Sequence, residues 1–542
     1  MKLALLAAAA CLVWSALGLS AEVRNVRVLT DGSVDCSSPE AVAAATLKGK
    51  TDEEKILNFW NWYRRTMWHY HEWPERRDFG VSILSQGCTL CGSHAALQML
   101  VLKAGGYKTR PCYVAGGGHT FIEVFFDEKW HALDAMTAFY IYSRGEPRYI
   151  LGLLEMQADP TLVSKAIEEK RVPDVFFACA REPEIVKKKT LPWSHYHPVP
   201  KMVEYYAEGC KPGEDAKPAE GGKPAEDAKP AAGRVGKEGE TLGGSYTPGK
   251  MNLNLKPGES VERVWDFEKG KYPERWAYPQ NAEVGPYHRC GHNDEFDKVN
   301  FPYWEPYLKE NLLEVKRCYR YFTNGRYDRR LPAAELLAAA DKKQGIKLDG
   351  GQLVPEGAAA GTLELPAAFP YVICDADVKL VYSRTEGAGE LELFALEKEG
   401  PRKVWSAGKT GDAEETATLG RFDEKKLGLH GYRLRLSVGA GCRLKAAAVS
   451  TVFMHNMFAG PYLVPGKNKV TVTVEDPKAL DGQQLKLTYK FADGDGWKDE
   501  HAVEKLVDKS PLEFEIEVKG PKHPRMRSVR LELAGGAPAP AK

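Results

Sequence analysis

The sequence has almost no net charge. Its 542 residues carry 75 Lys and Arg against 74 Asp and Glu, which gives a formal net charge of +1. A chain without an excess of one sign has no global field to attract nucleic acid or an anionic membrane surface. We therefore expect no nucleic-acid partner.

Long apolar runs are confined to the first 21 residues, MKLALLAAAACLVWSALGLSA. A single Lys, an apolar run and small residues near Ala21 form the pattern of a secretory signal peptide, with cleavage expected after Ala21. Because the run nears the length of a membrane span, an uncleaved anchor is the alternative. After cleavage we expect no stable membrane span, which predicts a secreted or periplasmic protein.

Cysteine is sparse. The sequence has 11 cysteines, spread over the whole chain. Export would allow disulfides to persist, but this spacing is not that of a small disulfide-stapled scaffold. The pairing stays open, and any cysteine that remains a thiol must be tolerated or useful.

Large apolar residues are nearly absent from residues 210–250, where an EDAKPA unit repeats. Such a segment cannot form a core, so it predicts a disordered linker. The linker separates a front domain, residues 22–209, from a β-rich domain, residues 251–460, and a small β-sandwich-like domain, residues 461–542. Alternating apolar runs punctuated by Gly, Pro and Asp predict the all-β rear part.

The front domain is expected to contain two helices followed by antiparallel strands. Thr51 and Glu54 have capping-box spacing, and apolar residues recur at helical period from Ile56 to Met67. A second helix is expected from Cys91 to Ala104, ended by a pair of glycines. Three short apolar segments predict strands, namely Arg110–Val114, His119–Phe126 and Trp130–Ala135.

Cys91 opens the second expected helix, where unpaired N–H groups and the helix dipole favour the nucleophilic thiolate. A cysteine nucleophile needs an imidazole to take its proton and a third group to hold that ring. His119 and Asp134 lie on the two strands that follow. We therefore predict a catalytic triad of Cys91, His119 and Asp134.

The register of the strand hairpin decides whether His119 and Asp134 can meet. If the turn is centred on residues 127–128, Asp134 lies opposite Phe121, which shares a face with His119. The two residues are then diagonal neighbours, with backbones roughly 7–8 Å apart. A shift by one residue would place them on opposite faces.

At these residues the sequence resembles the transglutaminase-like superfamily. The strand patterns His-x-x-x-Glu-Val and Trp-x-x-x-Asp are matched by His119–Val124 and Trp130–Asp134. The resemblance covers about Thr51 to Thr137. The family's nucleophile, its small residue four positions later, its apolar helix, its Gly and its Arg correspond to Cys91, Ala95, Leu97–Leu102, Gly106 and Arg110.

The resemblance implies a papain-like α+β front domain in which a Cys at a helix start packs against a sheet that carries His and Asp. It implies cysteine-dependent acyl transfer on amide bonds of proteins or peptides, by hydrolysis or transamidation, without metal or organic cofactor. The sequence departs from the family at Phe121, where Trp is usual, and at Ala135 and Met136, where Pro-Thr is usual. Neither change removes a triad member.

Two further residues are candidates for supporting roles. Gln86 could donate to an oxyanion beside the Cys91 backbone N–H, and Glu123 could support His119 or act as an acid. An exposed loop glutamine and a solvated or ion-paired carboxylate are the plainer interpretations. Cys88 and Cys91 also form a CxxC, for which a redox dithiol or half a zinc site is the alternative.

An alternative function of a different class is a non-catalytic cell-surface scaffold, in which the front domain is inactive and the rear β domains bind a ligand. The aromatic segment Tyr303–Tyr327 is either an exposed binding platform or packed core. The intact triad favours an exported cysteine hydrolase or acyltransferase with a protein or peptide substrate.

Overall fold

The structure of the protein is a computed structural model. The first 21 residues, Gln86, residues 303–321 and all of the predicted linker except residues 234–235 lie outside the described residues. The described residues are 22–69, 84, 88–89, 91–114, 119–135, 139–159, 161–166, 169, 171, 234–235, 251–265, 322–420, 430–456, 459–521 and 523–534.

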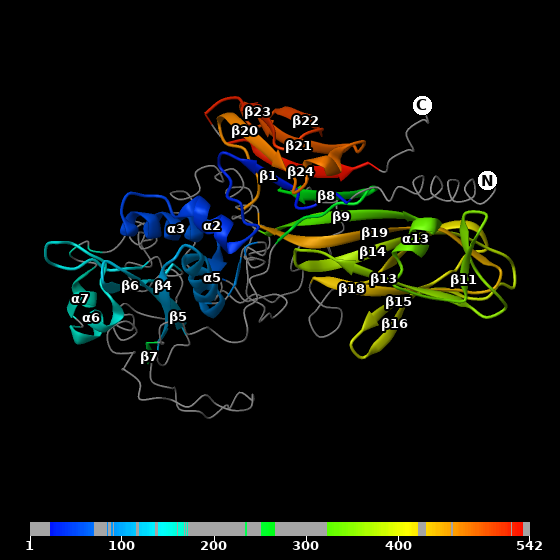
Figure 1. The fold of residues 1–542 in the computed structure, drawn as a ribbon, viewed down its shortest axis with the longest axis horizontal. Helices are drawn as coiled ribbons and strands as arrows, with labels where there is room; N and C mark the ends of the chain where they lie inside the picture. The colour runs from blue at the N-terminus through cyan, green and yellow to red at the C-terminus, as the bar shows by residue number, and fades with distance from the viewer. Residues whose placement is uncertain are drawn as a thin grey trace, which may run out of the picture.

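Three helices of the front part share one core with a small sheet (Figure 1). They are α2 (Pro39–Thr46), α3 (Asp52–Thr66) and α5 (Cys91–Ala104). Thr51 and Glu54 form the expected capping box, which satisfies N–H groups at the start of α3. Both predicted helices are therefore confirmed, the second with its predicted bounds.

The front sheet is antiparallel, with the strands β6 (Lys129–Leu133), β5 (His119–Phe126), β4 (Lys108–Val114) and β7 (Arg234–Val235) in that order. Asp127 and Glu128 have φ values of 46° and 61°, the conformation of a two-residue type I′ turn between β5 and β6. Phe126 therefore pairs with Lys129. The predicted hairpin register is confirmed.

Strand β7 comes from the segment that was predicted to be a linker. Arg234 pairs with Tyr113, and Val235 pairs with Cys112, so these two residues extend the front sheet at the edge of β4. At this point the structure differs from the predicted linker. Composition shows that a segment cannot build a core, but it does not exclude backbone pairing along an existing strand.

The rear part is mostly β-sheet, as predicted, and its sheets share one large core. Within the described ranges, a five-stranded sheet has the order β10 (Lys342–Gln344), β13 (Gly361–Ala368), β18 (Gly431–Val438), β15 (Leu391–Glu397) and β16 (Gly400–Ser406). Burial alternates along β18, one side chain facing the core and the next facing outward.

The largest sheet of the described residues has ten strands and runs through the rear part (Figure 1). Its main path is β11 (Ile346–Asp349), β12 (Gln352–Pro355), β19 (Cys442–Asn456), β9 (Phe322–Pro332), β8 (Glu259–Val264), β24 (Arg525–Leu533), β21 (Leu485–Asp493) and β22 (Asp499–Val507). Two more strands join it, because β14 (Ile373–Arg384) pairs with β19 and with β17 (Gly411–Thr418).

The first described residues belong to the rear part of the molecule. A three-stranded sheet has the order β1 (Arg27–Thr30), β20 (Gly466–Thr473) and β23 (Leu512–Val518), and Figure 1 shows the blue strand β1 beside the orange and red strands. Val23 bridges Leu255 and is fully buried in the rear core. This differs from the expected grouping of residues 22–209 into one front domain.

One sheet also crosses the expected boundary near residue 460. Strand β8 pairs with β9 on one side and with β24 on the other, so strands from both predicted rear domains share a hydrogen-bonded ladder.

Among the described residues, none of the helices combines the length and the apolar character needed to cross a membrane.

Candidate active site

Cys91 is the first residue of α5 and is partly exposed. Among the described residues it is a thiol rather than half of a disulfide. The first turn of α5 is fixed through His94, whose Nδ1 lies 2.8 Å from the hydroxyl of Tyr63 near the end of α3. N–H groups at a helix start and the helix dipole favour an anion, which suits a thiolate nucleophile.

Asp134 directly follows β6 and is 2% exposed. Its backbone N–H donates to the carbonyl of Phe139 and its carbonyl accepts from the Phe139 N–H, both at 2.9 Å. The carbonyl of the next residue, Ala135, accepts a hydrogen bond from Nε of the buried Arg64 at 2.8 Å. The backbone around Asp134 is therefore held from two directions.

Helix α3 contacts both the first turn of α5 and the residue that follows Asp134. Tyr63 contacts the first turn of α5, and its neighbour Arg64 binds the carbonyl that follows Asp134. Cys91 lies three residues before the histidine that Tyr63 contacts. Two adjacent residues of α3 thus connect the neighbourhoods of Cys91 and Asp134.

His119 is the first residue of β5, and its backbone pairs with Val114 of β4. In the hairpin, Ile122 pairs with Leu133. One further step of that register sets Asp134 opposite Phe121, so the backbones of His119 and Asp134 are diagonal neighbours roughly 7–8 Å apart. The structure therefore brings the backbones of these two predicted site residues together.

The two faces of the sheet have different neighbours. Ile122, Val124 and Leu133 share a core with α5. Arg110 and Glu123 occupy the alternate strand positions, which belong to the other face of the sheet. In the same register, positions 119 and 134 also belong to that other face. Positions 119 and 134 therefore belong to the face of the sheet opposite the one that α5 covers.

Glu123 is a fully buried, ion-paired carboxylate. Its Oε2 accepts from Nε of Arg110 at 2.6 Å, and its Oε1 accepts from the backbone N–H of Leu153 at 2.7 Å. Arg110 also stacks on Trp130, with its guanidinium carbon 4.1 Å from the ring centroid. The ion-paired interpretation of Glu123 is confirmed, and the residue ties β4 and β5 to the start of α6 (Leu153–Ala158).

The remaining candidates lie at the margin of the described region. Gln86 falls outside it. Cys88 begins β3 (Cys88–Thr89), whose backbone pairs in parallel with β2 (Trp68–His69). Within the described ranges, no three His, Cys, Asp or Glu side chains gather closely enough to hold a metal ion.

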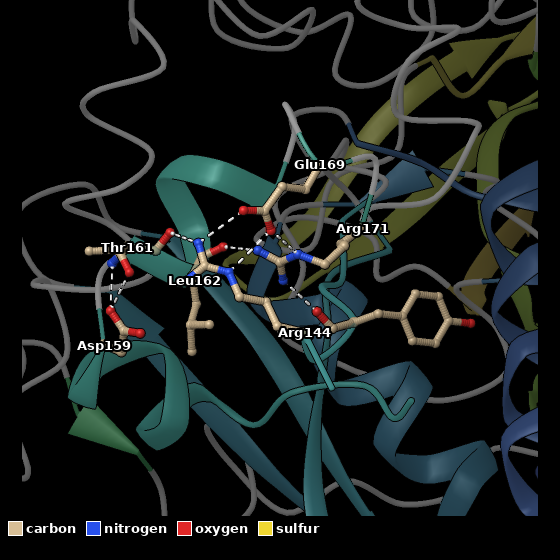
Figure 2. A network of polar contacts seen from close by, with 7 residues as sticks. Arg144, Asp159, Thr161, Leu162, Glu169 and Arg171 are labelled. Carbon is tan, nitrogen blue, oxygen red and sulfur yellow. Dashed lines mark hydrogen bonds and ion pairs between the residues drawn. The ribbon is translucent and has the colours of Figure 1, made fainter. Parts of the chain in front are cut away.

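A polar network that no sequence motif indicated holds the segment after β6 (Figure 2). Arg171 donates to the carbonyls of Tyr142 at 2.6 Å and Leu162 at 3.1 Å. Arg144 donates from Nε and Nη2 to the two carboxylate oxygens of Glu169, each at 3.1 Å. Hydrogen bonds from Arg144, and then from Arg171, hold the pKa of Glu169 below its ordinary value.

This network matters for the candidate site because the segment it holds continues the sheet beside β6. The Ala132 N–H donates to the carbonyl of Leu151, and the Leu151 N–H donates to that of Ile141. The same segment includes Phe139, the backbone partner of Asp134. The sequence does not predict this polar network, because its residues are scattered from Tyr142 to Arg171 and form no motif.

Comparison with known proteins assigns no family. No family model and no curated protein matches the chain. Among solved structures, a Paenibacillus xanthan lyase aligns at 9% identity with a TM-score of 0.17, over 38% of this chain and 25% of that one. The tandem CBM22-1 and CBM22-2 domains of Xyn10C from Paenibacillus barcinonensis align at 10% identity with a TM-score of 0.14, over 37% of this chain and 88% of that one.

A protein with a triple jelly-roll fold from an archaeal virus aligns at 12% identity with a TM-score of 0.11, over 33% of this chain and 52% of that one. The chain thus spans about a quarter of the lyase and about half of the viral protein. Scores this low carry no inference about fold or function.

Proposed function

We propose that this chain is an exported, cysteine-dependent acyl-transfer enzyme whose front domain is transglutaminase-like and papain-like. It acts on amide bonds of proteins or peptides. The thiolate of Cys91 attacks the amide carbonyl carbon after His119 has taken the thiol proton. His119 then gives that proton to the departing amine, which leaves a thioester on Cys91.

Asp134 orients the imidazole of His119 and stabilises its protonated form during the attack. Water or a second amine then attacks the thioester carbonyl, again losing its proton to His119, and the Cys91 thiolate is regenerated. Water gives hydrolysis, and an amine gives transamidation. The scheme balances without a metal ion or an organic cofactor.

The hairpin register is the single observation that carries the proposal. The type I′ turn at Asp127 and Glu128 fixes the pairing of β5 with β6, and this pairing puts positions 119 and 134 on adjacent strands with the same parity. A register shifted by one residue would have placed the predicted base and its predicted orienting group on opposite faces of the sheet.

The contacts of α3 add support. Tyr63 contacts the first turn of α5, and Arg64 binds the carbonyl after Asp134, so one helix contacts both segments that carry proposed site residues. Cys91 is partly exposed, as a nucleophile that must meet a protein substrate has to be.

The experiment is a substrate screen on the purified full chain, with casein proteolysis, amine incorporation into casein, and glycopeptide release. We expect turnover in at least one assay. Cys91→Ala and His119→Ala should abolish it to a similar extent, and the double variant should lose little more, because the residues act as one unit. Asp134→Asn should retain more activity than either.

Cys36→Ala is the matched control, since Cys36 is a partly exposed thiol like Cys91 and lies outside the candidate site. It should keep wild-type turnover. Full turnover by Cys91→Ala would refute the mechanism. If the wild-type chain is silent in all three assays, the non-catalytic scaffold becomes the better account.

A further inference from the structure

A cavity of about 460 Å³ opens in the rear part of the molecule, far along the chain from Cys91. Its walls come from β9 and β19 of the largest sheet, from β13 and β18 of the five-stranded sheet, and from the segment that leads into β8. The volume lies within the range of roughly 300–1,000 Å³ that small-molecule sites occupy.

One wall of the cavity is a buried polar cluster centred on Glu259, which is 4% exposed. Its Oε1 lies 3.2 Å from Nε of Arg329, and its Oε2 accepts from the backbone N–H of Lys256 at 2.8 Å. Tyr327 adds a hydroxyl that is hydrogen-bonded to the same carboxylate. Burial raises the pKa of Glu259, and buried polar groups that converge on a cavity are typical of a binding site.

The other lining residues include apolar and aromatic side chains. Phe369 stacks on Tyr327 with ring centroids 4.9 Å apart. Tyr432 presents its ring to the cavity, while its hydroxyl is held 2.8 Å from the hydroxyl of Thr451. Leu365 and other aliphatic side chains also line the cavity. A ligand must therefore offer one apolar surface and one surface rich in hydrogen-bonding groups.

The charges along the cavity are balanced. Its acidic lining residues are Glu22 and Glu259, and its Lys and Arg residues are Lys256 and Arg329. Glu259 is paired with Arg329 inside the cavity, so an anionic ligand would meet the carboxylate and a cationic ligand would meet the guanidinium. A neutral ligand that both donates and accepts hydrogen bonds satisfies both groups without separating them.

We propose that this cavity binds a neutral polyhydroxylated ligand, namely a monosaccharide or disaccharide unit. Hydroxyl groups of the sugar donate to Glu259 and accept from Arg329, and its C–H groups pack against the apolar side chains that line the cavity, such as Leu365. This site is independent of the proposed acyl-transfer site, because every residue that the inference uses belongs to the rear part of the molecule.

The test is isothermal titration calorimetry of the full chain with glucose, galactose, xylose and cellobiose as neutral probes, and with methylammonium and glucuronate as charged probes. We expect saturable binding of at least one neutral sugar and weaker or no binding of the charged probes. Arg329→Met should weaken sugar binding at least about tenfold, because it removes a charge-assisted hydrogen bond.

Two further variants separate binding from folding. Ala367→Phe puts a ring into the cavity and leaves the Glu259–Arg329 pair intact, so it should abolish binding while the melting temperature stays near that of wild type. Arg443→Met removes a surface guanidinium that pairs with Gln352 and Asp349 elsewhere, and it should bind like wild type. The proposal fails if no neutral sugar binds, if a charged probe binds more tightly, or if Ala367→Phe binds like wild type.

Discussion

The front and rear parts of the molecule each bury an ion pair, Glu123 with Arg110 and Glu259 with Arg329, but the rear part also carries exposed pairs along its strands. In the front part, Glu123 is fully buried against Arg110 beside the candidate site. In the rear part, cross-strand pairs such as Lys467 with Glu515 lie on the outer surface of the sheets, with 70% and 64% of each side chain exposed. Buried pairs fix geometry at a high desolvation cost, whereas exposed pairs contribute little.

Buried and exposed pairs therefore contribute differently to the fold. The front part holds a strand hairpin, a helix start and the α6 segment in fixed positions through buried polar contacts. The rear part derives its stability from apolar strand faces that alternate with solvated ones, as in β18. Substitutions of the same kind should therefore have unequal effects in the two parts.

The largest effect should come from breaking the buried pair. Glu123→Ala leaves Arg110 without its carboxylate and the Leu153 N–H without its acceptor, so we expect a loss of about 3–5 kcal/mol in the unfolding free energy of the front part. The matched rear variant, Glu515→Ala, should cost less than about 1 kcal/mol. Urea unfolding of the full chain, followed by tryptophan fluorescence and far-UV circular dichroism, measures both; equal losses would show that burial of the pair makes no difference.

A smaller effect is expected at the network behind β6. Arg171 is 8% exposed and donates to two backbone carbonyls and to Glu169, so Arg171→Met should cost about 2–3 kcal/mol. It should also accelerate amide hydrogen exchange in residues 139–151. Arg144 is more exposed and makes weaker contacts, so Arg144→Met serves as the control; similar exchange in both variants would contradict the anchoring role of Arg171.

A smaller loss of stability is expected when the contact between the front and rear parts is broken. The side-chain amide of the buried Asn456 donates to the carbonyls of Thr66 at 2.9 Å and Leu84 at 2.8 Å. Asn456→Ala leaves both carbonyls without this donor and should cost about 1–3 kcal/mol. Calorimetry should then show the front and rear transitions moving apart. A single unchanged transition would mean that this contact does not couple them.

The smallest effect is a pH dependence in the rear part. Arg435, followed by Lys342 and Arg433, holds the pKa of Glu364 at about 2. Because this folded-state pKa is depressed, the stabilisation is present above the unfolded value near 4.5 and is lost as pH falls toward 2. These basic partners are partly exposed, so Glu364→Gln should cost about 1 kcal/mol at neutral pH and flatten the acid limb of a stability profile.

Local patterns in the sequence predicted the front part well. The capping box at Thr51, the helix from Cys91 to Ala104 and the hairpin from His119 onward all depend on residues close together in the chain, where backbone preferences decide the outcome. The register was predictable because a two-residue turn leaves one consistent pairing.

Long-range pairing could not be predicted in the same way. Strand β1 pairs with β20 more than four hundred residues later, and β8 joins β9 to β24, although neither strand carries a mark of its partner. The supporting contacts of the site were missed for the same reason. Arg64 reaches Ala135 and Arg171 reaches Tyr142 only after the chain has folded.

The most direct test of the central claim is the rate at which iodoacetamide modifies Cys91, measured by mass mapping in wild type, His119→Ala and Asp134→Asn. If His119 takes the thiol proton at the end of the sheet, Cys91 should react rapidly at neutral pH in wild type, about ten- to a hundredfold more slowly in His119→Ala, and at an intermediate rate in Asp134→Asn. Equal rates at Cys91 in wild type and His119→Ala would show that the two residues do not act together and would contradict the account.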